Sequence, residues 1–233
     1  HWMARQPAVM SNAQPATWHD FGGFPEPLYQ LQYPAPGAPE LAQGVLQRLQ
    51  DAGLPVVADP KRPLDHGAWV PLMHLFPQAN VPVVQVALPA SAGPREVLAM
   101  GQALAGLRDE GVLVIGSGSM THNLGEFFNG RPELTDPPAA YANEFSRWIE
   151  DVVARGDVEA LLNYRTRAPH AVHAHPTEEH FLPIFFAEAF GVLNGTGVDL
   201  TSTVKGGTSL VLTVPNILVS GGTSIIASGV IID

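Results

Sequence analysis

The feature that most constrains the fold is an alternation of short buried strands with amphipathic helices. Residues Val81–Leu88 form an apolar run rich in Val, and Val112–Ile115 form a second one. Between them, Pro94–Glu110 has helical periodicity, with Pro near its first turn and Gly111 as a plausible C-cap. We therefore expect the α/β class, as a three-layer single domain whose mostly buried central sheet is flanked by helices.

Further segments fit the same scheme. Apolar spacing predicts helices over Leu41–Ala52, Ala139–Arg155 and Thr177–Phe190, the last with Glu178 and Glu179 in its first turn. Prolines recur throughout residues 1–40, so we expect that region to be loop-like.

Length and composition limit the classes of function. A chain of 233 residues favours one large domain over two. A net charge of −10 makes nucleic acid and anionic membranes poor partners. No apolar run reaches the roughly 18 residues of a membrane span, and no signal peptide is visible, so we expect a cytoplasmic protein. The absence of Cys excludes disulfides, thiolate nucleophiles and cysteine-based metal sites.

The last part of the chain has a different composition. Residues 194–233 contain no aromatic residue, and Gly206–Leu210 recurs as the similar Gly221–Ile225. Thr, Val and Ile predominate between the glycines, which favours short strands or a hairpin. We therefore predict a domain over residues 1–191, followed by a β-prone, Gly/Thr/Val/Ile-rich tail over 192–233.

Histidines gather in short motifs and indicate a metal centre. They are His1-Trp2, Asp65-His66-Gly67, Thr121-His122-Asn123-Leu124 and the stretch from His175 to His180. Neutral imidazole is the commonest protein metal ligand and is suited to proton transfer near neutral pH. Without Cys, a metal must be held by His and carboxylate, which suits non-haem iron, zinc or manganese.

Each histidine also has a purely structural interpretation. His122 can be a turn cap, and His66 a loop residue stacked on Trp69. His173 and His175 can be exposed residues before a helix, and His19 with Asp20 can form a simple turn. His74 and His170 are expected at the surface.

The order of the motifs resembles a known family. The chain carries His1-Trp2, His19-Asp20-Phe21-Gly22-Gly23-Phe24-Pro25, Tyr33-Pro34-Ala35-Pro36-Gly37, Asp65-His66-Gly67, Thr121-His122-Asn123-Leu124 and Pro176-Thr177-Glu178-Glu179-His180. Over about residues 1–191 this resembles the DOPA-dioxygenase branch of the class III (LigB-type) extradiol ring-cleavage dioxygenases.

The resemblance implies an enzyme that opens catechols beside their two hydroxyls, with O2 and non-haem Fe(II), and that is sometimes isolated with Zn(II). It implies His1 and His180 as metal ligands, with His175 as the alternative to His180. It places His122 close to the metal as acid and base, and His66 in the substrate pocket. His19, together with Asp20, remains a candidate that supports the site from outside the ligand set, and His19 is also a possible metal ligand.

Two departures keep other hypotheses open. The family's opening His-Gly-Ser-Pro motif, which carries another ligand, is not found here, and the sequence after Gly191 does not match the family's closing segment. One alternative is therefore a truncated, inactive relative that binds metal or a phenolic ligand weakly. The others are a copper site at an N-terminal His1, as in lytic polysaccharide monooxygenases, and a zinc hydrolase. Four cations are candidate partners of a substrate carboxylate: Arg62, Arg131, Arg165 and Arg167.

Overall fold

The computed structural model describes residues 2–130, 136–188 and 224–229. The strands of this part of the chain form one sheet; they are β1 (Met3–Ala4), β2 (Ala8–Met10), β3 (Val57–Asp59), β4 (Val83–Pro89), β5 (Val112–Ser117) and β6 (Ser224–Gly229). The α-helices are α1 (Pro39–Asp51), α2 (His66–Leu75), α3 (Pro94–Leu104), α4 (Leu124–Gly130), α5 (Ala140–Ala154), α6 (Val158–Leu162), α7 (Tyr164–Arg167), α8 (Ala171–Ala174) and α9 (Pro183–Glu188). Two 3-10 helices are η1 (Glu26–Gln30) and η2 (Ala105–Glu110).

The sheet has the strand order β3-β2-β4-β6-β5, and β1 also pairs with β4. Strands β4, β6 and β5 are parallel, whereas β2 runs antiparallel to β4. The side chains of β4 are buried from Val83 to Leu88, as expected for a strand covered on both faces.

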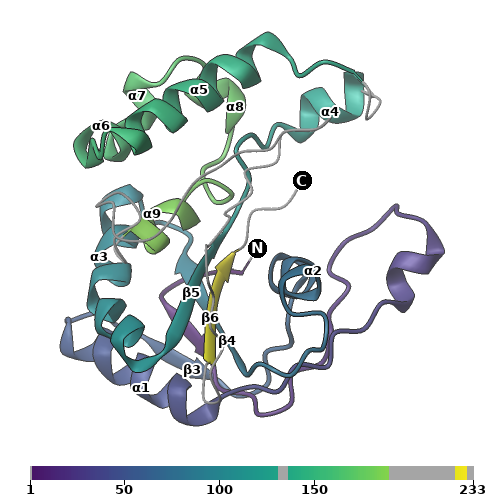
Figure 1. Ribbon diagram of the computed structural model, residues 1–233, viewed down its shortest axis with the longest axis vertical. Helices are drawn as coiled ribbons and strands as arrows, with labels where there is room; N and C mark the ends of the chain where they lie inside the picture. Colours follow the sequence, from purple (N-terminus) through teal and green to yellow (C-terminus); the bar gives the residue numbers. More distant parts are fainter. Residues whose placement is uncertain (1, 131–135, 189–223, 230–233) are drawn as a thin grey trace.

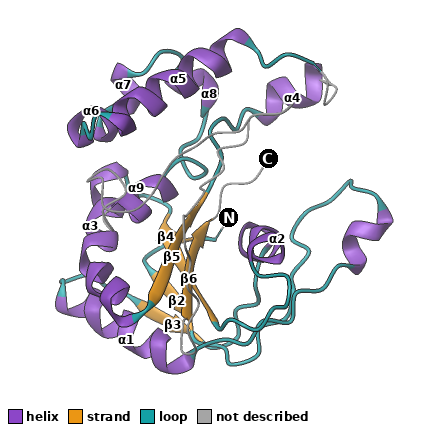
Figure 2. Cartoon of the chain, in the orientation of Figure 1, coloured by secondary structure: helices purple, strands orange, loops and turns teal. Residues whose placement is uncertain are grey.

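Helices cover both faces of the sheet (Figures 1 and 2). Helices α1, α3 and α9 lie on one face, and α2 lies on the other. Two apolar clusters match these layers: one joins Val45, Met100 and Phe185, and the other packs Trp69 of α2 against Val83. Helices α4 to α8 lie beyond the carboxyl end of β5. The predicted α/β class, with a central sheet flanked by helices, is confirmed.

Most predicted elements of the first 155 residues are found. Helices α1 and α5 and strands β4 and β5 lie where the apolar pattern places them. The predicted helix at Pro94 continues as α3 and then η2, and Gly111 ends it with the left-handed φ of 79° that favours glycine.

Two expectations need correction. The predicted helix at Thr177 begins only at Pro183, because a residue before proline is disfavoured in helical conformation whereas proline suits the first helical position. Residues 1–40 are not only loop, since β1 and β2 join the sheet there. One of the short strands predicted after residue 191 is found as β6, which pairs with β4 and β5; Gly206–Leu210 lies outside the described residues. The division at residue 191 stays a prediction.

No helix in the described part of the chain is long and apolar enough to cross a membrane.

Candidate metal centre and its flanking histidines

Two histidines from distant parts of the sequence meet beyond the end of β5. The rings of His122 and His180 are stacked, with centroids 3.4 Å apart and planes inclined by 13°. Glu179 joins them, and the possible ligand atoms of the three residues all lie within 4.8 Å of one another. The Nδ1 of His180 is 3.0 Å from Oε1 of Glu179, which also accepts a hydrogen bond from the Thr177 hydroxyl at 2.9 Å.

Backbone contacts bring these two segments together. His122 lies between β5 and α4, and its N–H donates to the carbonyl of Ala174 at 2.8 Å. His180 lies between α8 and α9, and its carbonyl accepts the N–H of Ser119 at 2.7 Å. Gly118 is needed for this approach, since a Cβ at that position would overlap the carbonyl oxygen of His180. The glycine- and serine-rich sequence after β5 therefore serves close backbone packing.

Burial keeps both imidazoles uncharged near neutral pH. It lowers the pKa of His180 to about 3, and the nearby charge of His122 adds to this shift. It also lowers the pKa of His122, against the opposing effect of the Glu179 carboxylate. A neutral imidazole has the lone pair that a metal ligand or a base requires.

The donor set fits a first-row transition metal. Imidazole and carboxylate are donors that suit non-haem iron or zinc. Because the two rings and the carboxylate already converge, an ion held by His180 would lie beside Glu179 and His122 without a large rearrangement of the backbone.

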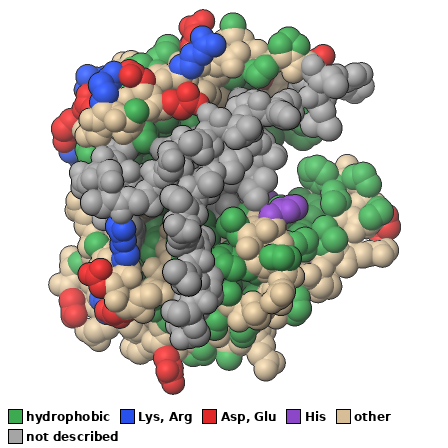
Figure 3. All heavy atoms as spheres, viewed as in Figure 1, with side chains coloured by type: hydrophobic (Ala, Val, Ile, Leu, Met, Phe, Trp, Pro, Cys, Tyr) green, Lys and Arg blue, Asp and Glu red, His purple; other side chains and the backbone are tan. Residues whose placement is uncertain are grey.

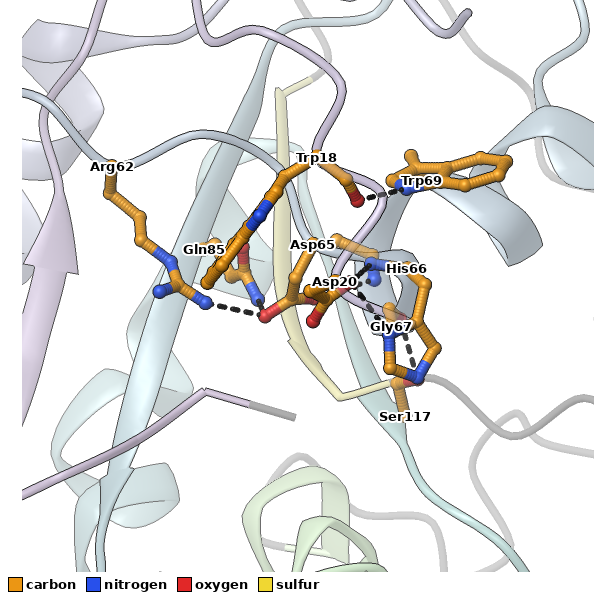
Figure 4. Close-up of polar contacts among 10 residues, drawn as sticks. Trp18, Asp20, Arg62, Asp65, His66, Gly67, Trp69, Gln85 and Ser117 are labelled. Atoms are coloured by element: carbon orange, nitrogen blue, oxygen red, sulfur yellow. Dashed lines mark hydrogen bonds and ion pairs between the residues drawn. The ribbon is translucent and has the colours of Figure 1, made fainter. Parts of the chain in front are cut away.

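His66 is held from another direction, at the first turn of α2. Oδ1 of Asp20 accepts hydrogen bonds from the backbone N–H of His66 at 3.0 Å and from its Nδ1 at 2.8 Å (Figure 4). Burial raises the pKa of Asp20, but the hydrogen bonds and charge of His66 outweigh it, so the pKa is lowered overall. The segment between β2 and α1, which carries η1, is called the arm. Figure 3 shows a histidine side chain next to hydrophobic side chains beside this arm.

A buried carboxylate fixes the start of α2. Asp65 is fully buried and caps the helix by accepting the N–H of Ala68. Its Oδ2 also accepts hydrogen bonds from Arg62 and Gln85, each at 2.7 Å. The guanidinium of Arg62 in turn lies 4.5 Å from the ring centroid of Trp2 and 4.9 Å from that of Trp18.

Comparison with known proteins decides the family. The family model described as the catalytic LigB subunit of aromatic ring-opening dioxygenase matches residues 1–209. The chain belongs to the LigB family. A 4,5-DOPA dioxygenase extradiol of Beta vulgaris is 45% identical over 188 residues, which cover 80% of this chain and 69% of the relative. The 4,5-DOPA dioxygenase extradiol of Escherichia coli is 37% identical, with 80% and 68% of the two chains covered.

A solved structure supports the same assignment. The crystal structure of an uncharacterized protein from Escherichia coli K12 is 31% identical and matches with a TM-score of 0.65, covering 82% of this chain and 72% of that one. This LigB-family chain is an extradiol ring-opening dioxygenase, an enzyme whose substrate is a small aromatic molecule.

The structure describes two more of the predicted site residues, His175 and His19. His1 lies outside the described residues. His175 is fully buried rather than exposed, with Nε2 at 2.8 Å from the carbonyl of Met120, whereas His173 is exposed. His19 lies between β2 and α1, where its Nε2 is 2.9 Å from the carbonyl of Leu31 and its ring packs edge-on against Trp69.

One residue of the candidate site was not predicted as a contributor. Glu179 was assigned to a helix, and its acidic side chain directly before His180 was the available signal. Asp20 was predicted, together with His19, either to support the site from outside the ligand set or to form a simple turn, and it contacts His66. Two of the four candidate arginines have other partners: Arg62 binds Asp65, and Arg165 donates to the carbonyls of His175 and Pro176.

Proposed function

We propose that the chain opens the ring of a catechol such as DOPA beside its two hydroxyl groups, using O2 and a non-haem iron. The observation that carries this proposal is the convergence of His122, Glu179 and His180 within 4.8 Å. The substrate class comes from the relatives in Beta vulgaris and Escherichia coli, whose names specify DOPA. Zinc, which takes the same donors, is the alternative occupant.

His180 is the proposed metal ligand among the described residues. The Glu179 carboxylate accepts its Nδ1–H at 3.0 Å, so Nε2 carries the lone pair for the metal. The resemblance adds His1 as a second protein ligand. When bound, Fe(II) supplies the activation of O2 that neither imidazole nor carboxylate can provide.

His122 and His66 are proposed to handle protons and substrate. His122 is stacked on His180, and burial lowers its pKa, so it is neutral and can accept a proton from a catechol hydroxyl beside the metal. His66 reaches the same region from α2 and contacts the bound substrate. His175 makes a structural contact through Met120 and is not required as a ligand in this scheme.

Metal content and product formation test the proposal together. The protein is reconstituted anaerobically with Fe(II), and bound iron and the O2-dependent ring-opened product of DOPA are measured. We expect His180→Ala to lose most of the bound iron. We expect His122→Gln to keep its iron but to open the ring about 100- to 10,000-fold more slowly, as is typical for loss of a general acid–base group.

The matched control is His74→Gln, which removes an exposed histidine of α2. This variant should bind iron and form product as the wild type does. Iron bound equally well by His180→Ala would contradict the ligand assignment. An iron-loaded wild-type protein that forms no ring-opened product from any catechol would contradict the function.

A further inference from the structure

We propose that Asp20 is a positioning residue for His66: it holds the ring hydrogen on Nδ1 and thereby makes Nε2 the basic nitrogen of that imidazole. The inference rests on the proposed function, in which His66 contacts the substrate. The observation behind it is that one carboxylate oxygen of Asp20 accepts from both the backbone N–H and the Nδ1 of His66, at 3.0 and 2.8 Å.

The segment that carries Asp20 is fixed to the segment that carries His66. The N–H of Trp18 donates to the carbonyl of Leu64 at 2.8 Å. The carbonyl of Trp18 accepts the indole N–H of Trp69 at 2.9 Å (Figure 4). His19 packs edge-on against Trp69, with ring centroids 5.5 Å apart. These contacts hold the Asp20 carboxylate at one place relative to the first turn of α2.

The partner of Nδ1 determines the tautomer. A carboxylate in its charged form has no hydrogen to donate, and interactions with His66 keep the pKa of Asp20 low despite the opposing effect of burial. Nδ1 must therefore be the donor in the contact of 2.8 Å. In the neutral imidazole the other nitrogen, Nε2, then has the lone pair.

The first turn of α2, which carries His66, is tied to the strand that leads to the candidate metal centre. The hydroxyl of Ser117, at the end of β5, donates to the carbonyl of Gly67 at 2.7 Å and ties the first turn of α2 to the strand that leads to His122. Phe21 packs edge-on against the His66 ring at 6.0 Å. Burial is the main cause that lowers the pKa of His122 and His180, and the charge of His66 adds to both shifts.

The pair gives His66 the properties of an oriented base. Nε2 can accept a hydrogen bond or a proton from a substrate hydroxyl, and the Asp20 carboxylate stabilises the resulting imidazolium. With the hydrogen on Nε2 instead, the ring would present a donor to the same hydroxyl and could not accept its proton. Asp20 acts on the substrate only through His66.

The test is the tautomer of His66 in metal-free protein, read from long-range ¹H–¹⁵N NMR spectra and assigned with His66→Gln. We expect the wild type to have the Nδ1–H form and Asp20→Asn to lose it as the single form. Asp20→Glu, which keeps a carboxylate, should restore it at least in part. In iron-loaded protein, Asp20→Asn should lower kcat about 10- to 100-fold without reducing bound iron.

Glu26→Gln is the matched control, because it removes one exposed carboxylate from the same arm without touching His66. It should leave both the tautomer and kcat unchanged. A wild-type His66 in the Nε2–H form, or an unchanged tautomer in Asp20→Asn, would overturn the proposal. Since the spectra need neither metal nor turnover, this result is separate from a failure of the dioxygenase activity itself.

Discussion

His66 and the His122–His180 pair are held in place by different kinds of contact. Side-chain carboxylates position His66: Asp20 binds the imidazole, and buried Asp65 caps α2. Backbone hydrogen bonds position His122 and His180. The N–H of His122 donates to the carbonyl of Ala174, and the carbonyl of His180 accepts the N–H of Ser119. The first arrangement depends on charge and hydrogen-bonding groups, and the second depends on the absence of a Cβ at Gly118.

This difference predicts which kind of substitution should disrupt each half of the site. Removing a charge should disturb α2 and leave the pair intact, whereas adding one carbon should separate the pair and leave α2 intact.

Asp65→Asn should have the largest effect. The change leaves the guanidinium of Arg62, whose side chain is only 13% exposed, without its carboxylate. Loss of one member of a buried ion pair costs about 3–5 kcal/mol of unfolding free energy. Chemical denaturation measures this loss. Asp157→Asn is the control, because Asp157 caps α6 through Ala160 but lies partly exposed, and Asn is an equally good cap. Equal losses in the two variants would contradict the importance of the buried pair.

Gly118→Ala should separate the histidine pair. The added Cβ would overlap the carbonyl of His180, so the α8–α9 turn must move away from the end of β5. We expect a loss of about 2–3 kcal/mol of unfolding free energy, together with weaker Fe(II) binding. Gly106→Ala, where a Cβ meets nothing within 4 Å, should change neither quantity. Unaltered metal affinity in Gly118→Ala would show that backbone packing does not position His180.

Protonation of His175, which is buried near the His122–His180 pair, should lower the stability of the folded protein at acidic pH. Burial lowers its pKa from 6.5 to about 4, although the hydrogen bond to Met120 opposes the shift. The unfolded chain therefore takes up a proton as the pH falls below 6.5, whereas the folded chain does not until about 4. Stability is fully present above the unfolded pKa and falls as the pH decreases, with a loss of about 2 kcal/mol by about pH 5.

The difference between wild type and His175→Gln isolates this contribution. Gln keeps a donor for the Met120 carbonyl but does not titrate, so the variant should lose less stability on acidification than the wild type. His74→Gln, which removes an exposed imidazole, should follow the wild type. Parallel pH dependences for wild type and His175→Gln would contradict the buried neutral state of His175.

The sequence predicts the regular core better than the site. The Val-rich run of β4 and the apolar periodicity of α1 and α5 are local signals, and the structure confirms them. Helix α2 was not predicted, because it is apolar on most sides and contains Pro71, so it lacks a clear helical stripe. Strand β2 has only three residues between prolines and polar residues, too few for a period to appear.

The site depends on contacts between distant segments. The motifs identified His122, His180 and His66, but their mutual geometry follows from long-range contacts such as that of Ser119 with His180. The burial of His175 arises in the same way, from packing against Phe145 and Phe181. Nothing in the local sequence distinguishes His175 from exposed His173, which lies two residues earlier.

The most direct test of the function is the fate of O2. Iron-loaded protein is given DOPA under ¹⁸O₂, and the ring-opened product is analysed by mass spectrometry. Ring opening by a dioxygenase breaks one carbon–carbon bond and places an oxygen atom from O2 on each of the two carbons. We predict one heavy oxygen in the new carboxylate of the product, and little or no ring-opened product from His180→Ala. A ring-opened product whose new carboxylate contains no oxygen from O2 would contradict the account.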